Sequence, residues 1–395
     1  AASDVYKRQH KGMQVGGVMF TVGALGIAMM WLTGLDSVEN LIDNTYQILR
    51  LNIWFPLLLL TTGGQLLFLS MVIRLVEYRG LSKEFAKKTV FFRRFAIVSL
   101  TIYTFQYLDA IPRGESVDMK QRFTTPLPLD VTAWLMDIAE APDFHSTYDT
   151  IVAAGASNLR GDPEVQRRGE AARATLFDFV TPLIAQRRRE PGPDLLSTLC
   201  STEFEGVMLS DDEIRSFCSF LLAAGVETTY RALSSLLNLL WQRPDEWTML
   251  RGRRDLVTAV CAEGLRLAPP VHALSRGVVA DTEIGGRELR RGDRVVAIMA
   301  SANRDPEVFD DPDRFDPLRF QDNPDREFGA RAQILSFGYG THSCTGSQLA
   351  KMEMVEAIGL LLDRFATVTF VDGVPDDRGY VLRSPEHLRV VLRGE

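Results

Sequence analysis

A single cysteine in a glycine-rich loop near the end of the chain constrains the fold more than any other feature. Residues 337–346 read FGYGTHSCTG, and a helix-like apolar pattern at 347–362 follows directly. Glycines let such a loop turn tightly, because they carry no Cβ. Gly346 then opens a helix whose N-terminal N–H groups favour a thiolate at Cys344. The alternative is a buried structural cysteine, but the fixed spacing of phenylalanine, glycines, histidine and cysteine favours a metal ligand, with Phe337 covering the sulfur.

These residues resemble the haem-binding loop of the cytochrome P-450 family, in the Phe-Gly-x-Gly-x-His-x-Cys-x-Gly form that suggests a bacterial member. The positions that carry the resemblance are Phe337, Gly338, Gly340, His342, Cys344 and Gly346. The resemblance implies that Cys344 is the proximal ligand of haem b, iron protoporphyrin IX, where a thiolate favours O–O cleavage. Thr345 departs from the family pattern, which more often has an aliphatic residue or proline here, and we expect it to change the hydrogen bonding around the sulfur.

Composition limits the alternatives. The 395 residues suffice for one large domain or two smaller ones, and the net charge of −7 gives no indication of a nucleic-acid partner. The four cysteines are Cys200, Cys218, Cys261 and Cys344, and no two share a short spacing. This pattern argues against both a disulfide framework and a zinc site, and it fits a reducing, cytoplasmic location.

The N-terminal part of the chain is much more hydrophobic than the rest. Residues 1–9 read AASDVYKRQ and resemble an in-frame translation of the adapter sequence used in DNA library preparation, so we exclude them from the fold prediction. Residues 10–114 are strongly hydrophobic, and the uncharged stretches at 12–35 and 51–73 are each long enough to span a bilayer. A third, shorter candidate lies at 95–108. The alternative is a set of buried helices in a soluble protein.

From about residue 115 the pattern changes to interspersed charges with proline and glycine breaks, which predicts a mainly α-helical domain with small β-sheets. Ser210 is a predicted N-cap, followed by acidic first-turn residues, for a long helix that ends near Trp241. The other predicted helices are at 132–138, 144–158, 163–189 and 253–267, and short strands are predicted between 271 and 300.

The long helix contains a motif that could interrupt it. Residues 224–229 read AGVETT, and a threonine at 228 can donate a hydrogen bond back to the carbonyl of Ala224 and loosen the helix. Alanine and glycine in a helix also serve close packing, so both explanations stay open on the motif alone. It resembles the oxygen-activating motif of the family, which would make Thr228 the hydroxyl that assists oxygen activation and Glu227 part of the proton path.

Two further sets of residues resemble family features. Glu263 and Arg266 lie one helical turn apart, and the family would add Arg319 to form a buried Glu-Arg-Arg cluster behind the haem loop. Its role there is structural, although a solvated surface pair is the usual explanation for such spacing. Arg276 and His342 resemble partners of the haem propionates, against the alternatives of a surface arginine and a loop histidine.

The resemblance covers about residues 115–395, so the expected fold is a partial cytochrome P-450 fold preceded by a hydrophobic, predicted transmembrane helical region. It implies a haem-thiolate monooxygenase that inserts one atom of O2 into a small apolar substrate. Electrons would come from NAD(P)H through a ferredoxin and a ferredoxin reductase, because the chain shows no flavin or iron–sulfur segment. The haem domain would be cytoplasmic, with membrane association through residues 12–108 if that region is genuine.

The first hundred-odd residues of the family, with its N-terminal strands, substrate cap and one propionate clamp, are not recognisable in this chain. Two explanations stay open: a natural fusion of a membrane region to a haem domain, or a chimera of two fragments, which the adapter-like start favours. The alternative function is therefore a chimeric or truncated membrane protein that carries an inactive haem-domain fragment.

Overall fold

The computed structural model describes residue 104 and residues 107–138, 143–155, 161–192, 194–204 and 206–394. The adapter-like start and the predicted spans at 12–35 and 51–73 lie outside the described residues, as does most of the candidate at 95–108. Among the helices of the described ranges, none combines the length and the apolar character needed to cross a bilayer.

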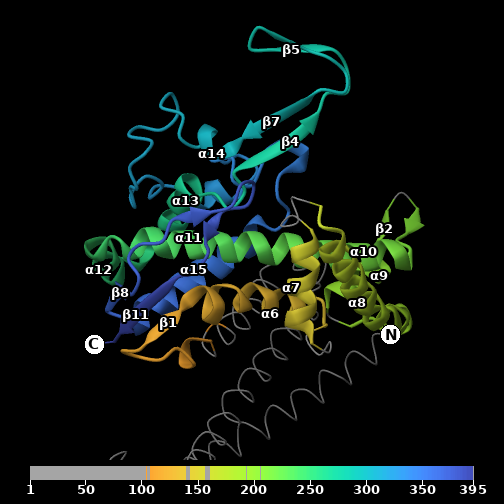
Figure 1. Ribbon diagram of the computed structural model, residues 1–395, viewed down its shortest axis with the longest axis horizontal. Helices are drawn as coiled ribbons and strands as arrows, with labels where there is room; N and C mark the ends of the chain where they lie inside the picture. The colour runs from red at the N-terminus through yellow and green to blue at the C-terminus, as the bar shows by residue number, and fades with distance from the viewer. Residues whose placement is uncertain are drawn as a thin grey trace, which may run out of the picture. The chain divides into compact units, whose positions relative to one another are not determined.

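The described chain is mainly helical (Figure 1). The α-helices are α6 (Pro126–Leu135), α7 (Phe144–Ala154), α8 (Pro163–Arg189), α9 (Leu195–Ser201), α10 (Asp211–Leu222), α11 (Thr228–Trp241), α12 (Pro244–Gly252), α13 (Val257–Leu267), α14 (Met299–Ala302) and α15 (Ser347–Arg364). Shorter π-helical and 3-10 segments are η1 (Lys120–Thr124), η2 (Ala223–Glu227), η3 (Arg254–Leu256), η4 (Pro324–Phe328) and η5 (Gly340–His342).

The strands form small antiparallel sheets. The largest has three strands in the order β1–β11–β8, made of β1 (Ser116–Asp118), β11 (Arg389–Arg393) and β8 (Thr367–Phe370). The two-stranded sheets pair β2 (Glu203–Phe204) with β3 (Val207–Met208), β4 (Ala273–Gly277) with β7 (Arg294–Ile298), β5 (Thr282–Ile284) with β6 (Arg287–Leu289), and β9 (Asp377–Arg378) with β10 (Ser384–Pro385). The predicted mainly α architecture with small sheets is confirmed for the described residues.

Helix ends agree with the sequence where a capping side chain defines them. Helix α8 has the predicted limits, because the Asp162 carboxylate accepts from the backbone N–H groups of Glu164 and Val165 ahead of a proline in the first turn. Helix α10 begins after a capping box in which the Ser210 hydroxyl accepts from the Glu213 N–H and the Glu213 carboxylate accepts from the Ser210 N–H.

Three predicted helices have wrong boundaries. The helix expected at 144–158 ends at Ala154, and the other two begin at different residues than predicted. The helix expected at 132–138 is α6, which begins at Pro126, because proline is tolerated in the first turn of a helix. The predicted helix at 253–267 begins only at Val257, and the unpredicted helix α12 precedes it from Pro244, again with proline at the first position. Prolines that look like breaks therefore mark helix starts here.

The long helix connects two hydrophobic cores. One core packs α11 against α13 and α15, and a second packs α6 to α10 together. The close approach of α11 to α13 depends on Gly264, where an added Cβ would lie only 2.5 Å from Cδ1 of Leu236. Val226 in η2 belongs to the second core and Leu233 in α11 to the first, so the π-helical segment lies where the two cores meet.

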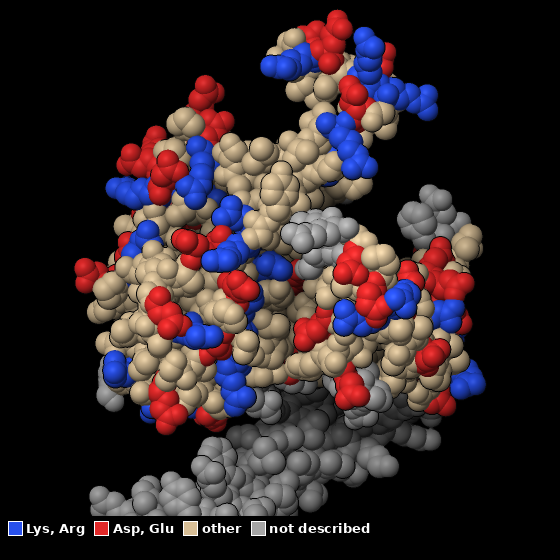
Figure 2. All heavy atoms as spheres, in the orientation of Figure 1, with Lys and Arg blue, Asp and Glu red and all other residues tan. Residues whose placement is uncertain are grey.

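The β5–β6 hairpin projects from the rest of the described chain (Figure 1). Its turn is formed by Gly285 and Gly286, both with positive φ of 58° and 76°, the conformation that two-residue hairpins require and glycine adopts most easily. Figure 2 shows side chains of both charges gathered on this projecting segment. Below it, β7 exposes the apolar side chains of Val296 and Ile298.

Candidate active site

The cysteine loop is closed by its own backbone. The N–H of Cys344 donates to the carbonyl of Phe337 over 2.7 Å, so the two ends of the loop lie side by side. Gly338 and Gly340 both have positive φ, at 71° and 70°, as their place in a tight turn requires. Cys344 is exposed rather than buried in the core, so the structure does not place it as a packing residue.

Helix α15 starts directly behind this loop and is fixed at its first turn. The Ser347 hydroxyl and the Gln348 side-chain amide both donate to the carbonyl of Phe328, over 2.9 and 2.7 Å. The Phe328 ring in turn packs against the Phe337 ring, with centroids 5.7 Å apart. The helix N-terminus beside Cys344 is therefore held in one position by the residues behind the loop.

The motif in the long helix does interrupt it. Segment η2 is π-helical, and it separates α10 from α11 at the predicted position. The Thr228 hydroxyl donates to the carbonyl of Ala224 over 2.8 Å, as expected from the sequence, and the Thr229 hydroxyl donates to the carbonyl of Gly225 over 2.8 Å. A π-helical turn widens the helix and is frequent at functional sites.

One cavity of about 340 Å³ has both features in its walls. Of the sequence-predicted residues it brings together Ala224, Thr228, Phe337, Gly338, His342, Cys344 and Gly346. The other lining residues are Thr132, Leu135, Leu195, Leu221, Gly225, Thr229, Ala232, Leu265, Pro270, Val271, Leu274, Met299, Ser336, Leu349, Ala350 and Met354. The cavity is therefore mostly apolar, with a thiol in one wall and threonine hydroxyls in another, which is the general character of a small-molecule site.

Three predicted residues do not line this cavity. Gly340 shapes the turn of the cysteine loop from behind. Arg276 lies on β4, is exposed, and donates to the carbonyl of its own neighbour Ser275 over 3.0 Å. Glu227 lies beside the charged side chains of Arg231 and Lys120 instead. The structure thus separates residues that the sequence resemblance had placed at one centre.

Glu227 is buried beside two cationic side chains. Its Oε1 accepts from the Arg231 guanidinium over 2.7 Å, and Arg231 also reaches the Ser384 hydroxyl at 3.4 Å. Lys120 lies over the ring of Tyr230, 5.4 Å from its centroid. Burial, together with the nearby Arg231 charge, lowers the pKa of Lys120, and burial raises the pKa of Tyr230 to about 12.

Glu263, Arg266 and Arg319 form one buried cluster, as the resemblance implied. The side chains of Glu263 and Arg266 are fully buried and make a two-pronged ion pair, with N···O distances of 2.7 and 2.8 Å. Arg319 Nε donates to both oxygens of the same carboxylate, over 3.2 and 3.1 Å. The solvated surface pair, which the spacing alone also allowed, is excluded by this burial.

Hydrogen bonds connect the cluster to the cysteine loop through Asn303. Arg266 donates to the Asn303 carbonyl over 3.0 Å, and the side-chain oxygen of Asn303 accepts from the Leu335 N–H over 2.7 Å. Its side-chain amide donates to the Ser336 hydroxyl, which donates to the carbonyl of Leu265. The residues that enter the loop are thus fixed from the cluster side. Asn303 and Ser336 had no predicted role, because Asn303 lies 33 residues before Ser336 and only the fold brings them together.

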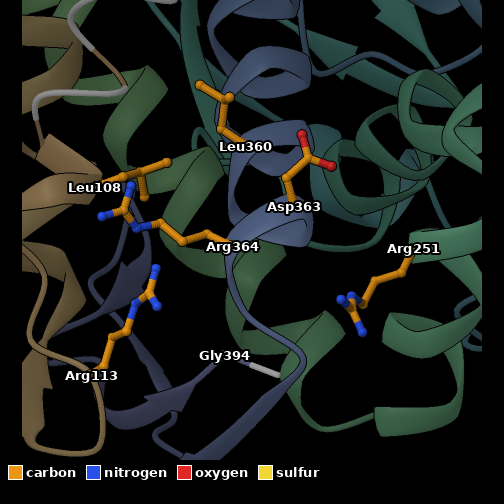
Figure 3. A pocket seen from close by; sticks show the side chains of 7 residues that line it. All are labelled: Leu108, Arg113, Arg251, Leu360, Asp363, Arg364 and Gly394. Atoms are coloured by element: carbon orange, nitrogen blue, oxygen red, sulfur yellow. The ribbon is translucent and has the colours of Figure 1, made fainter. Parts of the chain in front are cut away.

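A second cavity, of about 420 Å³, lies near the C-terminal ends of α12 and α15 (Figure 3). It is lined by Leu108, Arg113, Arg251, Leu360, Asp363, Arg364 and Gly394. Figure 3 shows the Arg113 and Arg364 side chains extending toward each other, with Arg251 on the opposite side. Arg364 pairs with Asp109, and Asp363 pairs with Arg254. No sequence-predicted site residue lines it, so we place the candidate active site in the first cavity.

The chain is similar to known proteins in both sequence and fold. The family model described as Cytochrome P450 matches residues 156–387 of the chain. Among curated relatives, the chain is similar to linalool 8-monooxygenase of Pseudomonas putida, with 33% identity over 288 residues that cover 72% of this chain and 68% of the relative. It is also similar to nocardicin C N-oxygenase of Nocardia uniformis, with 34% identity over 289 residues that cover 72% of this chain and 69% of the relative.

Pulcherriminic acid synthase of Bacillus subtilis is 32% identical over 250 residues, and the chain spans 62% of its length. Two solved structures share the fold. The open, histidine-tagged cytochrome P450 EryK of S. erythraea has a TM-score of 0.68 and 29% identity, covering 81% of this chain and 80% of that chain. A Bacillus megaterium cytochrome P450 in complex with corticosterone has a TM-score of 0.67 and 27% identity, covering 75% and 78%. From the cysteine loop, the interrupted helix and these matches together, the chain belongs to the cytochrome P450 family.

Proposed function

We propose that this chain is a haem-thiolate monooxygenase that inserts one atom of O2 into an apolar organic substrate and releases the other as water. The observation that carries the proposal is the single cavity that has the Cys344 loop in one wall and the interrupted helix at Thr228 in another. Cys344 would supply a thiolate ligand to the cofactor, and Thr228 would supply a hydroxyl to the reaction.

The residues present fit haem b. The cavity offers one soft sulfur donor at Cys344, and the positions beside it are Gly338 and Gly346, which leave the approach to the sulfur free of side chains. An added Cβ at Gly346 would lie 3.8 Å from the Cys344 sulfur, in the space beside the ligand. Ala224 and Gly225, also in the lining, contribute almost no side chain to the cavity. When bound, haem supplies the activation of O2 and the oxygen transfer.

The chain's own residues would bind, orient and move protons. Cys344 would hold the iron, and Phe337 would keep water away from the sulfur. The Thr228 hydroxyl is held by the Ala224 carbonyl at 2.8 Å, so it accepts further hydrogen bonds on the cavity side. Glu227 would supply protons from behind the helix, where Arg231 holds its carboxylate. His342 lines the cavity and is the proposed propionate partner, whereas Arg276 would need to turn from its present contact to take that role.

The proposed electron source is NAD(P)H through a ferredoxin and a ferredoxin reductase, in a cytoplasmic setting. The apolar lining of Leu135, Leu221, Val271 and Leu274 favours a small apolar substrate, and relatives whose names include linalool and a steroid act on molecules of this character. The lining residues Leu221 and Ala224 come from the long helix, and Val271 and Leu274 come from the segment that leads into and begins β4.

The test is incorporation of isotope-labelled dioxygen. The full-length chain, loaded with haem and supplied with NAD(P)H, ferredoxin and reductase, is incubated with linalool and related terpenoids. We expect product molecules with one labelled oxygen atom, and none from the Cys344→Ala variant at the same protein concentration. A folded, haem-containing wild type that yields no labelled product would instead favour the alternative, a membrane protein with an inactive haem-domain fragment.

A further inference from the structure

The hydroxyl of Thr132 is buried in the wall of the cavity without a hydrogen-bonding partner among the described residues. Thr132 lies on α6, and only 2% of its surface is exposed. Its Oγ1 is one of the buried side-chain oxygen atoms that form no hydrogen bond, yet the residue lines the cavity. A buried hydroxyl left unbonded costs free energy, so such an atom in a cavity wall indicates a partner that occupies the cavity.

Threonine in a helix normally has a partner of its own. In this chain the helical threonines that donate back to the carbonyl four residues earlier include Thr150, Thr175, Thr181, Thr228 and Thr229. Thr132 makes no such bond to Pro128. Its oxygen instead faces η2, 3.3 Å from the position that a Cβ on Gly225 would take. The hydroxyl is therefore directed at the interrupted helix, and the missing side chain of glycine permits this close approach.

The surroundings suit one oxygen atom. The hydroxyls of Thr228 and Thr229 donate to backbone carbonyls, so their oxygen atoms remain available only as acceptors. The Thr132 hydroxyl, without a carbonyl partner, can donate into the cavity. Most of the remaining lining of this part of the cavity is aliphatic, including Leu135, Leu195 and Leu221. The wall thus offers one hydrogen-bond donor and two acceptors in an otherwise apolar space.

We propose that Thr132 anchors the oxygen atom of an apolar ligand that carries one hydroxyl or carbonyl group. Such a ligand would place its hydrocarbon part against the leucines and its oxygen within hydrogen-bond reach of the Thr132 hydroxyl. Thr132 is then a specificity-determining residue, because an analogue without the oxygen leaves the buried hydroxyl unpaired and binds less tightly. The inference rests on the proposed function for its setting, but binding can be measured without turnover.

The experiment compares two ligands of the same carbon skeleton, linalool and the hydrocarbon myrcene. Both are titrated calorimetrically into the full-length haem-loaded chain and its Thr132→Val, Thr132→Ser and Thr150→Val variants. Valine keeps the shape of threonine and removes the hydroxyl, and serine keeps the hydroxyl. Thr150 is the matched control, because it is only half-buried and its hydroxyl donates to the carbonyl of Ser146 on α7 over 2.8 Å.

We expect wild type to bind linalool about 10-fold more tightly than myrcene, which corresponds to one hydrogen bond to a buried hydroxyl. Thr132→Val should remove this preference by weakening linalool alone, Thr132→Ser should keep it, and Thr150→Val should change neither affinity. The proposal is overturned if wild type does not prefer linalool, or if Thr132→Val weakens both ligands equally, as it would if the hydroxyl held only a water. It is also overturned if Thr132→Ser loses the preference while its thermal unfolding stays that of wild type. Absence of oxygenated product would leave these affinities unaffected, so failure of the proposed function is a separate result.

Discussion

Replacing Arg266 by methionine should destabilise the chain more than any exposed substitution. The guanidinium makes five hydrogen bonds, two to the Glu263 carboxylate and three to backbone carbonyls, and its side chain is fully buried. Methionine fills much of the volume but removes the donor of the Asn303 and Pro312 carbonyls, while the Arg314 carbonyl still accepts from Arg319. Glu263 keeps part of its compensation, because Arg319 and the Asp316 N–H still donate to it.

The expected loss is about 3–5 kcal/mol, the range for breaking a buried ion pair by removing one partner. This is a large share of a typical folding free energy of about 5–15 kcal/mol. The measurement is urea unfolding of the full-length chain, followed by tryptophan fluorescence, since Trp241 and Trp247 lie in the first core. The midpoint should fall while the slope stays the same, because the surface exposed on unfolding is unchanged.

Two comparison variants separate burial from charge. Arg319 is 11% exposed, so Arg319→Met should cost less than Arg266→Met. Arg389 pairs with Asp372 at 3.2 Å, but both side chains are more than half exposed, so Arg389→Met should cost only about 0–1 kcal/mol. If Arg266→Met costs no more than Arg389→Met, the buried cluster does not stabilise the fold and the reasoning fails.

Three further predictions concern other parts of the chain. Glu353 is fully buried and both its oxygen atoms are unbonded within the described chain, so burial raises its pKa from 4.5 to about 8. A raised carboxyl pKa gives stability that is present below pH 4.5 and lost as pH rises to about 8. Glu353→Gln should therefore make the urea midpoint less dependent on pH between these values, and an equal dependence in both proteins would contradict the prediction. Thr228→Ala should leave substrate binding intact but lower product formed per NAD(P)H and raise hydrogen peroxide release, whereas unchanged coupling would mean that the motif only packs. Gly264→Ala should cost about 1–3 kcal/mol by urea unfolding, because its Cβ would lie 2.5 Å from Leu236, while Gly277→Ala, with nothing within 4 Å, should not; equal costs would exclude overpacking as the cause.

The elements that could be predicted from the sequence are those that depend on side chains close to one another along the chain. The capping box at Ser210, the interruption before Thr228 and the glycine turn at Cys344 all follow from side chains within a few residues of the feature. Helix α12 was missed because Pro244 reads equally well as a break or as a first helical position, and only packing of Trp247 into the core decides between them.

The site was harder to predict than the fold, because it depends on contacts distant in sequence. Thr132 is brought against Gly225 only when α6 packs on η2, and no pattern near residue 132 indicates it. Glu227 does not line the cavity, and its helix neighbour Arg231 also contacts Ser384, a residue distant in sequence that no local pattern indicates. The predicted roles of Arg276, His342 and Glu227 rest on the family resemblance and stay predictions.

The central claim is that Cys344 binds haem iron as a thiolate, and the difference spectrum of the reduced chain with carbon monoxide tests it most directly. For the full-length protein the account predicts the long-wavelength Soret band of a thiolate ligand, and for Cys344→His the shorter-wavelength band of a histidine ligand. The same spectrum from both proteins, or a histidine-type band from folded wild type, would contradict the account.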